Sequence, residues 1–97
     1  MATLLVVNLP PALEEDLIDY LLAQETVRGF TSYHIKGHGE FENLSIAEQV
    51  SGQIRRVQFE ILLDDDEEAH LVVAGLGSEV GRNIRYWQQS VYGEGVT

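Results

Sequence analysis

Residues 29–63 set the architecture of this chain: they read GFTSYHIK at 29–36, a glycine-rich connection at 37–53, and RVQFEILL at 56–63. Both flanking runs are rich in aromatic and β-branched residues, which suit a pleated, half-buried surface. The connection holds three of the nine glycines. It is too long for a tight hairpin turn, and loops of this length in small domains usually carry function or are disordered. The sequence therefore predicts two strands joined by one long loop, which either carries function or is disordered.

The composition predicts a single acidic domain that spans residues 1–97. A chain of 97 residues is too short for two cores, and a hydrophobic content of 44% is typical of a globular protein. Sixteen Asp and Glu against six Lys and Arg give a net charge of −10. This charge repels phosphate backbones and anionic membrane surfaces, so nucleic acid is not an expected partner.

The chain contains no cysteine, which excludes disulfides and thiolate metal sites. No stretch reaches the roughly 20 apolar residues of a membrane span, and the N-terminus lacks the basic region of a signal peptide. We therefore expect a cytoplasmic protein without direct membrane insertion.

The remaining elements alternate around these two strands. Residues 4–9 form a short apolar run that predicts a central strand buried on both faces. Pro11 suits the first turn of a helix, which we expect to end near Glu25. Its apolar face consists of Leu13, Leu17, Tyr20 and Leu21.

The acidic run at residues 64–68 precedes a second helical pattern, and we interpret it as an N-cap and first turn rather than as a metal site. Gly77 is the predicted end of this helix, and residues 83–92 have the composition of a last strand. Four side chains mark the apolar face of the helix: Ala69, Val72, Val73 and Leu76.

The predicted order βαββαβ gives an α+β, ferredoxin-like fold, with an antiparallel four-stranded sheet and both helices on one face. The other face is left open. Since neighbouring strand residues point to opposite faces, either Tyr86 or Trp87 lies away from the helices. An uncovered face with apolar side chains predicts a homo-oligomer.

Two segments resemble the P-II signalling proteins: residues 29–39, GFTSYHIKGHG, and residues 57–65, VQFEILLDD. Together with the element order, the resemblance covers nearly the whole chain. The combination of GFTS with GHG, LSIAEQV at 44–50 and Arg55-Arg56 is similar to a small uncharacterised P-II-like family that is often encoded beside heavy-metal efflux systems.

The resemblance implies a homotrimer with inward-facing sheets, in which the long connection is the partner-reaching T-loop. It also implies a nucleotide cleft between subunits, where Lys36, Gly37 and Gly39 match the turn at the base of the T-loop. The modifiable tyrosine is absent, because the loop carries Phe41 instead. The phosphate-holding segment is reduced to residues 77–83, which contain Glu79 and no lysine. This composition argues against ATP binding.

His34 and His38 provide a candidate metal site. Their spacing of four leaves both on one face of a continuing strand, and imidazole is a good ligand for copper, zinc or nickel. Glu40 can supply a third metal ligand at the loop base, so a transition metal is a candidate cofactor. His70 could become a ligand only if an interface between subunits brings it near. The alternative is that Gly37 interrupts the strand and that His34 makes an ordinary hydrogen bond.

The loop itself carries a candidate docking surface. Residues 44–50 predict a short helix, with Ser45 and Glu48 as a capping box, and an amphipathic turn on a loop can grip a protein partner such as a membrane transporter. Four apolar residues form the predicted partner-binding surface: Phe41, Leu44, Ile46 and Val50.

These observations favour a non-catalytic regulatory or accessory protein that docks through residues 39–52 under ligand control, with metal homeostasis as the setting that the resemblance implies. One alternative is a nucleotide-binding signalling protein, in which Lys36, Gly37 and Gly39 act with Arg82 or Arg85 on phosphate. Another is a small enzyme with its active site in the subunit cleft. Arg55 and Arg56 are expected in surface or interface ion pairs.

Overall fold

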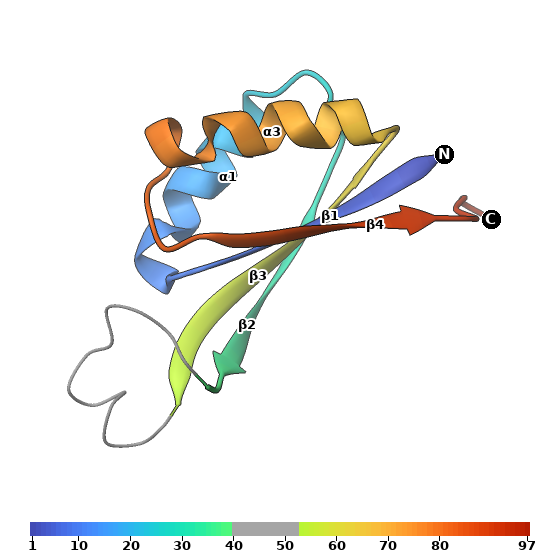
Figure 1. The fold of residues 1–97 in the computed structure, drawn as a ribbon. Helices are drawn as coiled ribbons and strands as arrows, with labels where there is room; N and C mark the ends of the chain where they lie inside the picture. Colours follow the sequence, from blue (N-terminus) through green and yellow to red (C-terminus); the bar gives the residue numbers. More distant parts are fainter. Residues whose placement is uncertain (40–52) are drawn as a thin grey trace.

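The computed structural model of the chain describes residues 1–39 and 53–97, and Figure 1 shows their arrangement. The elements follow the predicted order: β1 (Ala2–Leu9), the 3₁₀ turn η1 (Pro11–Leu13), α1 (Glu14–Leu22), β2 (Thr31–Gly37), β3 (Ile54–Leu63), α3 (Asp66–Glu79) and β4 (Arg85–Val91). Within the described ranges, no helix is long and apolar enough to cross a membrane.

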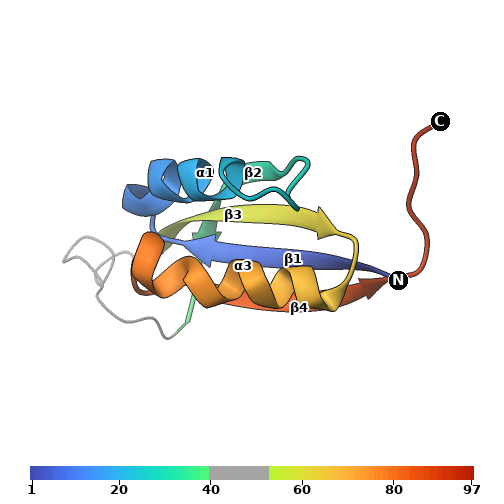
Figure 2. The same ribbon diagram turned by 90° about the horizontal axis from the view of Figure 1, so that it is seen from above.

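The four strands form one antiparallel sheet in the order β2-β3-β1-β4. Both helices lie on the same face of this sheet, as Figures 1 and 2 show from two directions. The predicted α+β, ferredoxin-like fold is therefore confirmed. Beyond the helices, β2 and β3 continue together as a two-stranded stem toward the connection that joins them.

The two faces of the central strands differ in composition. In β1 and β3, Leu5, Val7 and Leu9 pair with Ile61, Phe59 and Val57, and all six side chains are buried against the helices. Alternate residues of both strands therefore form the buried face of the sheet. Register also places Trp87 opposite Val6 and Tyr86 opposite Val7, so Trp87 is the aromatic residue on the open face.

Helix α3 begins as the acidic run predicts. The Asp65 carboxylate accepts a hydrogen bond of 2.9 Å from the Glu68 amide, and the Glu68 carboxylate accepts one of 3.0 Å from the Asp64 amide. These reciprocal bonds satisfy two backbone donors at the helix start. The interpretation of this run as an N-cap is confirmed.

The predicted helix ends are less accurate. Helix α1 ends at Leu22, three residues before Glu25, and α3 continues through Gly77 to Glu79. The amides of Val80 and Gly81 both donate to the carbonyl of Leu76 at 3.0 Å, and Gly81 has a φ of 154°. The prediction that α3 ends at Gly77 was wrong, because the residue with a positive φ that ends the helix is Gly81.

Close contact between the two helices depends on Gly75. A Cβ atom at this position would collide with the Tyr20 hydroxyl, and that hydroxyl donates a hydrogen bond of 2.8 Å to the carbonyl of Val72. Burial, and then the nearby charge of Glu79, raise the pKa of the Tyr20 phenol. The glycine that lowers helix propensity in α3 is therefore the one that lets α1 approach.

Candidate ligand site at the base of the β2–β3 connection

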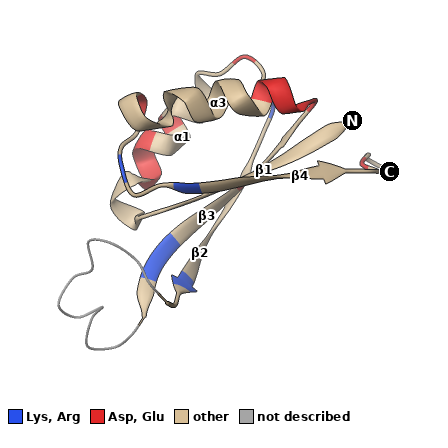
Figure 3. Cartoon of the chain, in the orientation of Figure 1, with Lys and Arg blue, Asp and Glu red and all other residues tan. Residues whose placement is uncertain are grey.

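Five of the six Lys and Arg residues gather at the end of the sheet where the β2–β3 connection leaves it. Lys36 ends β2, Arg55 and Arg56 begin β3, and Arg85 begins β4 beside Asn8. Arg82 precedes β4 in the turn after α3. Figure 3 colours these positions blue, and the acidic positions of the first turn of α1 are coloured red.

Arg56 is buried at the centre of this end, with 1% of its surface exposed. Its Nε donates to Asn8 Oδ1 at 2.6 Å, and its Nη2 donates to the carbonyl oxygens of Asn8 and Asn83 at 2.9 Å each. Arg56 therefore lies inside the fold rather than on its surface, and the described residues hold it through hydrogen bonds to amide and carbonyl oxygens. A strand position on the open face can bury a long side chain when neighbouring carbonyls accept its donors.

A chain of hydrogen bonds continues from Arg56 across the open face. The Asn8 amide donates to Gln58 at 3.4 Å, and the Gln58 amide donates to the Tyr33 hydroxyl at 2.8 Å. Tyr33 donates in turn to the Glu60 carboxylate at 2.6 Å. This last bond is the main reason why the pKa of the Tyr33 phenol is raised. The open face is thus a connected polar network with apolar residues around it.

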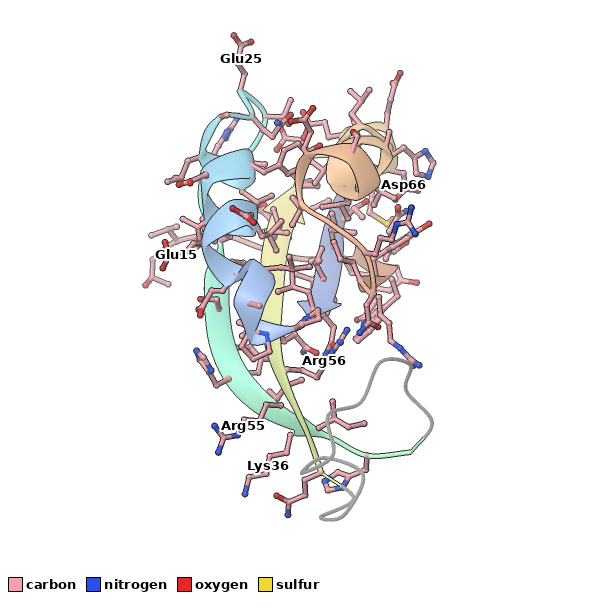
Figure 4. All side chains as sticks on the ribbon, turned by 90° about the vertical axis from the view of Figure 1, so that its left-hand side faces the viewer. Glu15, Glu25, Lys36, Arg55, Arg56 and Asp66 are labelled. Atoms are coloured by element: carbon pink, nitrogen blue, oxygen red, sulfur yellow. The ribbon has the colours of Figure 1, made fainter. Side chains whose placement is uncertain are left out.

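Lys36 and Arg55 lie on the other side of the stem. They occupy paired positions of β2 and β3, and Figure 4 shows their side chains on the side away from Arg56. Both are exposed. The next turn begins with Gly37 as the last residue of β2 and includes Gly39, whose φ is 103°. The structure therefore places the predicted loop-base residues Lys36, Gly37 and Gly39 on one short segment.

Arg82 and Arg85 flank the turn between α3 and β4. Between them, Asn83 has a φ of 63°, a left-handed conformation that asparagine tolerates better than most residues. The Asn83 carbonyl is the one that Arg56 holds. Arg56 therefore contacts the turn before β4 directly, whereas Lys36 at the end of β2 lies on the opposite side of the stem.

The candidate metal ligands do not form a site within the described residues. His34 pairs in register with Val57, and its Nε2 lies 3.4 Å from Glu14 Oε1. His38 follows the end of β2 at Gly37, while Glu40 lies outside the described residues. In residues 1–39 and 53–97, no group of three His, Asp or Glu side chains could hold a metal.

His70 lies at the other end of the fold. It follows Asp66, which accepts a hydrogen bond of 2.6 Å from Thr3 at the start of β1, whereas His34 lies level with the end of β1. Within one subunit, His70 therefore cannot join His34. The predicted helix at residues 44–50 and the partner-binding residues Phe41, Leu44, Ile46 and Val50 lie outside the described residues.

Sequence reasoning missed Asn8 and Asn83, the two partners of Arg56. Asn8 carried a usable signal, since it is the polar residue that interrupts the apolar run LLVVNL, and a buried amide requires a hydrogen-bond partner. Asn83 carried none, because its role depends on a backbone carbonyl. A hollow of about 570 Å³ between α1 and α3 was also unforeseen. It is acidic, with Asp16, Asp19 and Glu79 in its wall.

Comparison with known protein families gives one match, and it covers residues 1–97. The chain belongs to the DUF3240 family, a family of proteins of unknown function. The expected membership of a small uncharacterised family is thereby confirmed. No curated protein matches the sequence.

Solved structures agree with this assignment. A DUF3240 family protein from Shewanella baltica OS155 superposes with a TM-score of 0.71 at 22% identity, covering 99% of this chain and 96% of that one. A candidate PII-like signaling protein from Thermus thermophilus gives 0.61 at 16% identity, with coverages of 91% and 83%. The periplasmic divalent cation tolerance protein CutA from Archaeoglobus fulgidus gives 0.73 at 11% identity, with coverages of 99% and 88%. These similarities show the fold.

Proposed function

We propose that this DUF3240 protein is a non-catalytic regulatory protein that binds a small ligand at the base of the β2–β3 connection. Ligand binding there controls docking of residues 39–52 onto a protein partner, such as a membrane transporter. One observation supports this most directly: five of the six basic residues lie at this end of a protein whose net charge is −10. Such a concentration favours an anionic group on the ligand.

The ligand is an anion in the cleft between subunits of the proposed trimer, held by Lys36 and the backbone of Gly37 and Gly39 of one subunit and by Arg82 and Arg85 of its neighbour. Lys36 and Arg82 are exposed, and the backbone of a glycine turn can approach a phosphate or carboxylate closely. A nucleotide would be one such anion. A nucleotide is therefore the first ligand to test, ahead of a metal.

The second candidate ligand is a transition metal bound by His34, His38 and Glu40. The contact of 3.4 Å between His34 and Glu14 favours it, because it brings a carboxylate within reach of an exposed imidazole. The fold shared with a divalent cation tolerance protein is consistent with a role in metal homeostasis. In this arrangement, the Glu14 carboxylate either becomes a further ligand of the metal or competes with the metal for His34.

The proposal includes a cytoplasmic homotrimer with the open faces of the sheets turned toward one another. Three large side chains on this face support association: Tyr33 at 40% exposure, Leu62 at 43% and Trp87 at 42%. Exposed apolar patches of this kind are typical of interfaces. Sedimentation equilibrium measures the subunit number, and a monomer at micromolar concentration would contradict this part of the proposal.

A thermal-shift panel on metal-stripped protein tests the ligand. Copper, zinc, nickel and cobalt are compared with ATP, ADP and cyclic AMP. A ligand specific for the native state raises the melting temperature by mass action, worth about 2.7 kcal/mol at a hundred times its dissociation constant. Two double variants assign the shift: R82Q/R85Q should abolish an anion response, and H34A/H38A a metal response. A panel without any shift would contradict both candidate ligands.

A further inference from the structure

Arg56 joins three parts of the chain that are far apart in sequence. From the first strand residues after the long connection, its guanidinium reaches the end of β1 at Asn8 and the turn before β4 at Asn83. It is the largest side chain that the described part of the fold buries completely. Figure 4 shows it pointing from β3 into the space beside the turn that precedes β4.

The contact with Asn83 fixes a turn that lies between two arginines. Asn83 is in the left-handed region, with a φ of 63°, and its carbonyl direction is fixed by a charge-assisted bond of 2.9 Å from Arg56. Arg82 precedes Asn83 directly, and Arg85 follows two residues later. Arg85 is also held by its pairing with Asn8 in the sheet, so the bond from Arg56 bears most directly on Arg82 and the turn itself.

The chain of bonds from Arg56 also reaches β2. Every donor points the same way, from Arg56 through Asn8 and Gln58 to Tyr33 and then Glu60. The amide oxygens must face the cation, so the charge of Arg56 sets the direction of the whole chain. Tyr33 belongs to β2, the strand that ends at Lys36 and Gly37.

An apolar side chain could fill the same space, and burying a guanidinium carries a desolvation penalty. What an apolar side chain cannot do is make directional bonds to two separate segments at once. The planar fork of arginine does so, and the single ammonium of lysine does not reproduce its geometry. The arrangement is therefore suited to fixing positions more than to adding stability.

We propose that Arg56 is a positioning residue, which ties the turn at residues 82–85 to the β2–β3 stem so that the two basic segments of the candidate site respond as one unit. An anion bound at the turn then also stabilises β2, and an anion bound at the end of β2 also stabilises the turn. The response to an anion rests on the proposed function, while the tie between the segments stands on the contacts alone.

Hydrogen exchange, resolved by residue, tests the tie in the free protein. The variant R56K keeps the charge and removes the fork; R55K makes the same change at the neighbouring, exposed position. In R56K, amides at residues 82–85 and in β2 should exchange about tenfold faster, the change that accompanies loss of about one net hydrogen bond. In R55K and in the core amides of residues 57–61, exchange should stay as in the wild type.

Two results would overturn the proposal. Equal acceleration in the core amides would mean that Arg56 only stabilises the fold, and unchanged exchange at residues 82–85 would mean that it does not hold the turn. If R56K does not fold, N8A replaces it, because this change removes the Nε acceptor and breaks the chain before Gln58. It should accelerate the same two segments by a smaller factor.

The second arm adds ATP as the anionic probe. In the wild type, ATP should slow exchange at residues 82–85 and in β2 together; in R56K, only at residues 82–85. Slowing of both segments in R56K would overturn the coupling. If ATP slows neither segment in the wild type while free R56K shows the loosened turn, the anionic ligand of the proposed function is wrong and the positioning role stands.

Discussion

The two faces of the sheet solve the same burial problem in different ways. On the helix side, Val7, Phe59 and their neighbours exclude water by packing. On the open side, Arg56 is equally buried, yet it is held by hydrogen bonds to Asn8 and Asn83. Packing is non-directional and spread over many contacts, whereas the polar network depends on a few oriented groups. The first face therefore gives stability, and the second gives fixed relative positions.

The largest expected effect comes from the packed face. Phe59→Ala should lower the free energy of unfolding by about 3–5 kcal/mol, because it leaves a cavity beside Phe30, whose ring centroid lies 5.8 Å away. Urea unfolding measures the change. A loss below about 1 kcal/mol would mean that this face repacks easily, which would contradict the comparison between the faces.

The matched control is Leu62→Ala, on the open face of the same strand with 43% of its surface exposed. In an isolated subunit, this change should stay within about 0.5 kcal/mol. A loss that is larger and grows with protein concentration would show that a second subunit covers the open face. The control therefore sharpens the comparison and tests the proposed assembly.

The packing of α1 against α3, which together cover the buried face of the sheet, should be sensitive to one methyl group added at Gly75. Gly75→Ala should cost about 1–3 kcal/mol, because the new Cβ meets the Tyr20 hydroxyl. Gly77→Ala is the matched control in the same helix; nothing lies within 4 Å of its Cβ position, and it should gain up to about 1 kcal/mol from helix propensity. Thermal unfolding measures both. Equal effects would contradict the close contact between the helices.

The N-cap of α3 stabilises the start of the helix that covers this face. Asp65→Ala should cost about 1 kcal/mol, since it removes the acceptor for the Glu68 amide. Glu67→Gln removes one charge from the same turn without removing a cap, so it should cost only about 0.3–1 kcal/mol through the helix dipole. Chemical denaturation of both variants gives the comparison. A larger loss for Glu67→Gln would mean that charge, rather than capping, starts this helix.

The smallest effect is expected on the open face and depends on pH. The bond to Glu60 raises the pKa of the Tyr33 phenol above its ordinary value of 10.0 in the folded protein. The unfolded chain therefore loses this proton first, so the stabilisation is complete below about pH 10 and disappears as the pH rises through the folded-state pKa. Unfolding of wild type and Tyr33→Phe is compared across this range.

The wild type should lose more stability than Tyr33→Phe as the solution becomes alkaline. Parallel curves for the two proteins would show that the hydroxyl does not hold its proton through Glu60. Tyr20, whose pKa is also raised, is present in both proteins and cancels in the difference.

The element order was predictable because its signals are local. Aromatic and β-branched composition identified the strands β2 and β3, and the acidic run before α3 identified its cap. The end of α3 was not predictable from Gly77, since the terminating Gly81 is recognised only by its left-handed φ and its bonds to Leu76. The position of His34 beside Glu14 likewise depends on how α1 crosses β2.

By itself, the sequence determined the strands, the helices, the acidic cap of α3 and the long connection at the centre of the chain, because periodicity and capping act over a few residues. Only the tertiary structure decided that Arg56 is buried and joins Asn8 to Asn83, and that the basic residues meet at one end. Those relations arise from strand order and register, which bring together residues that no local pattern connects.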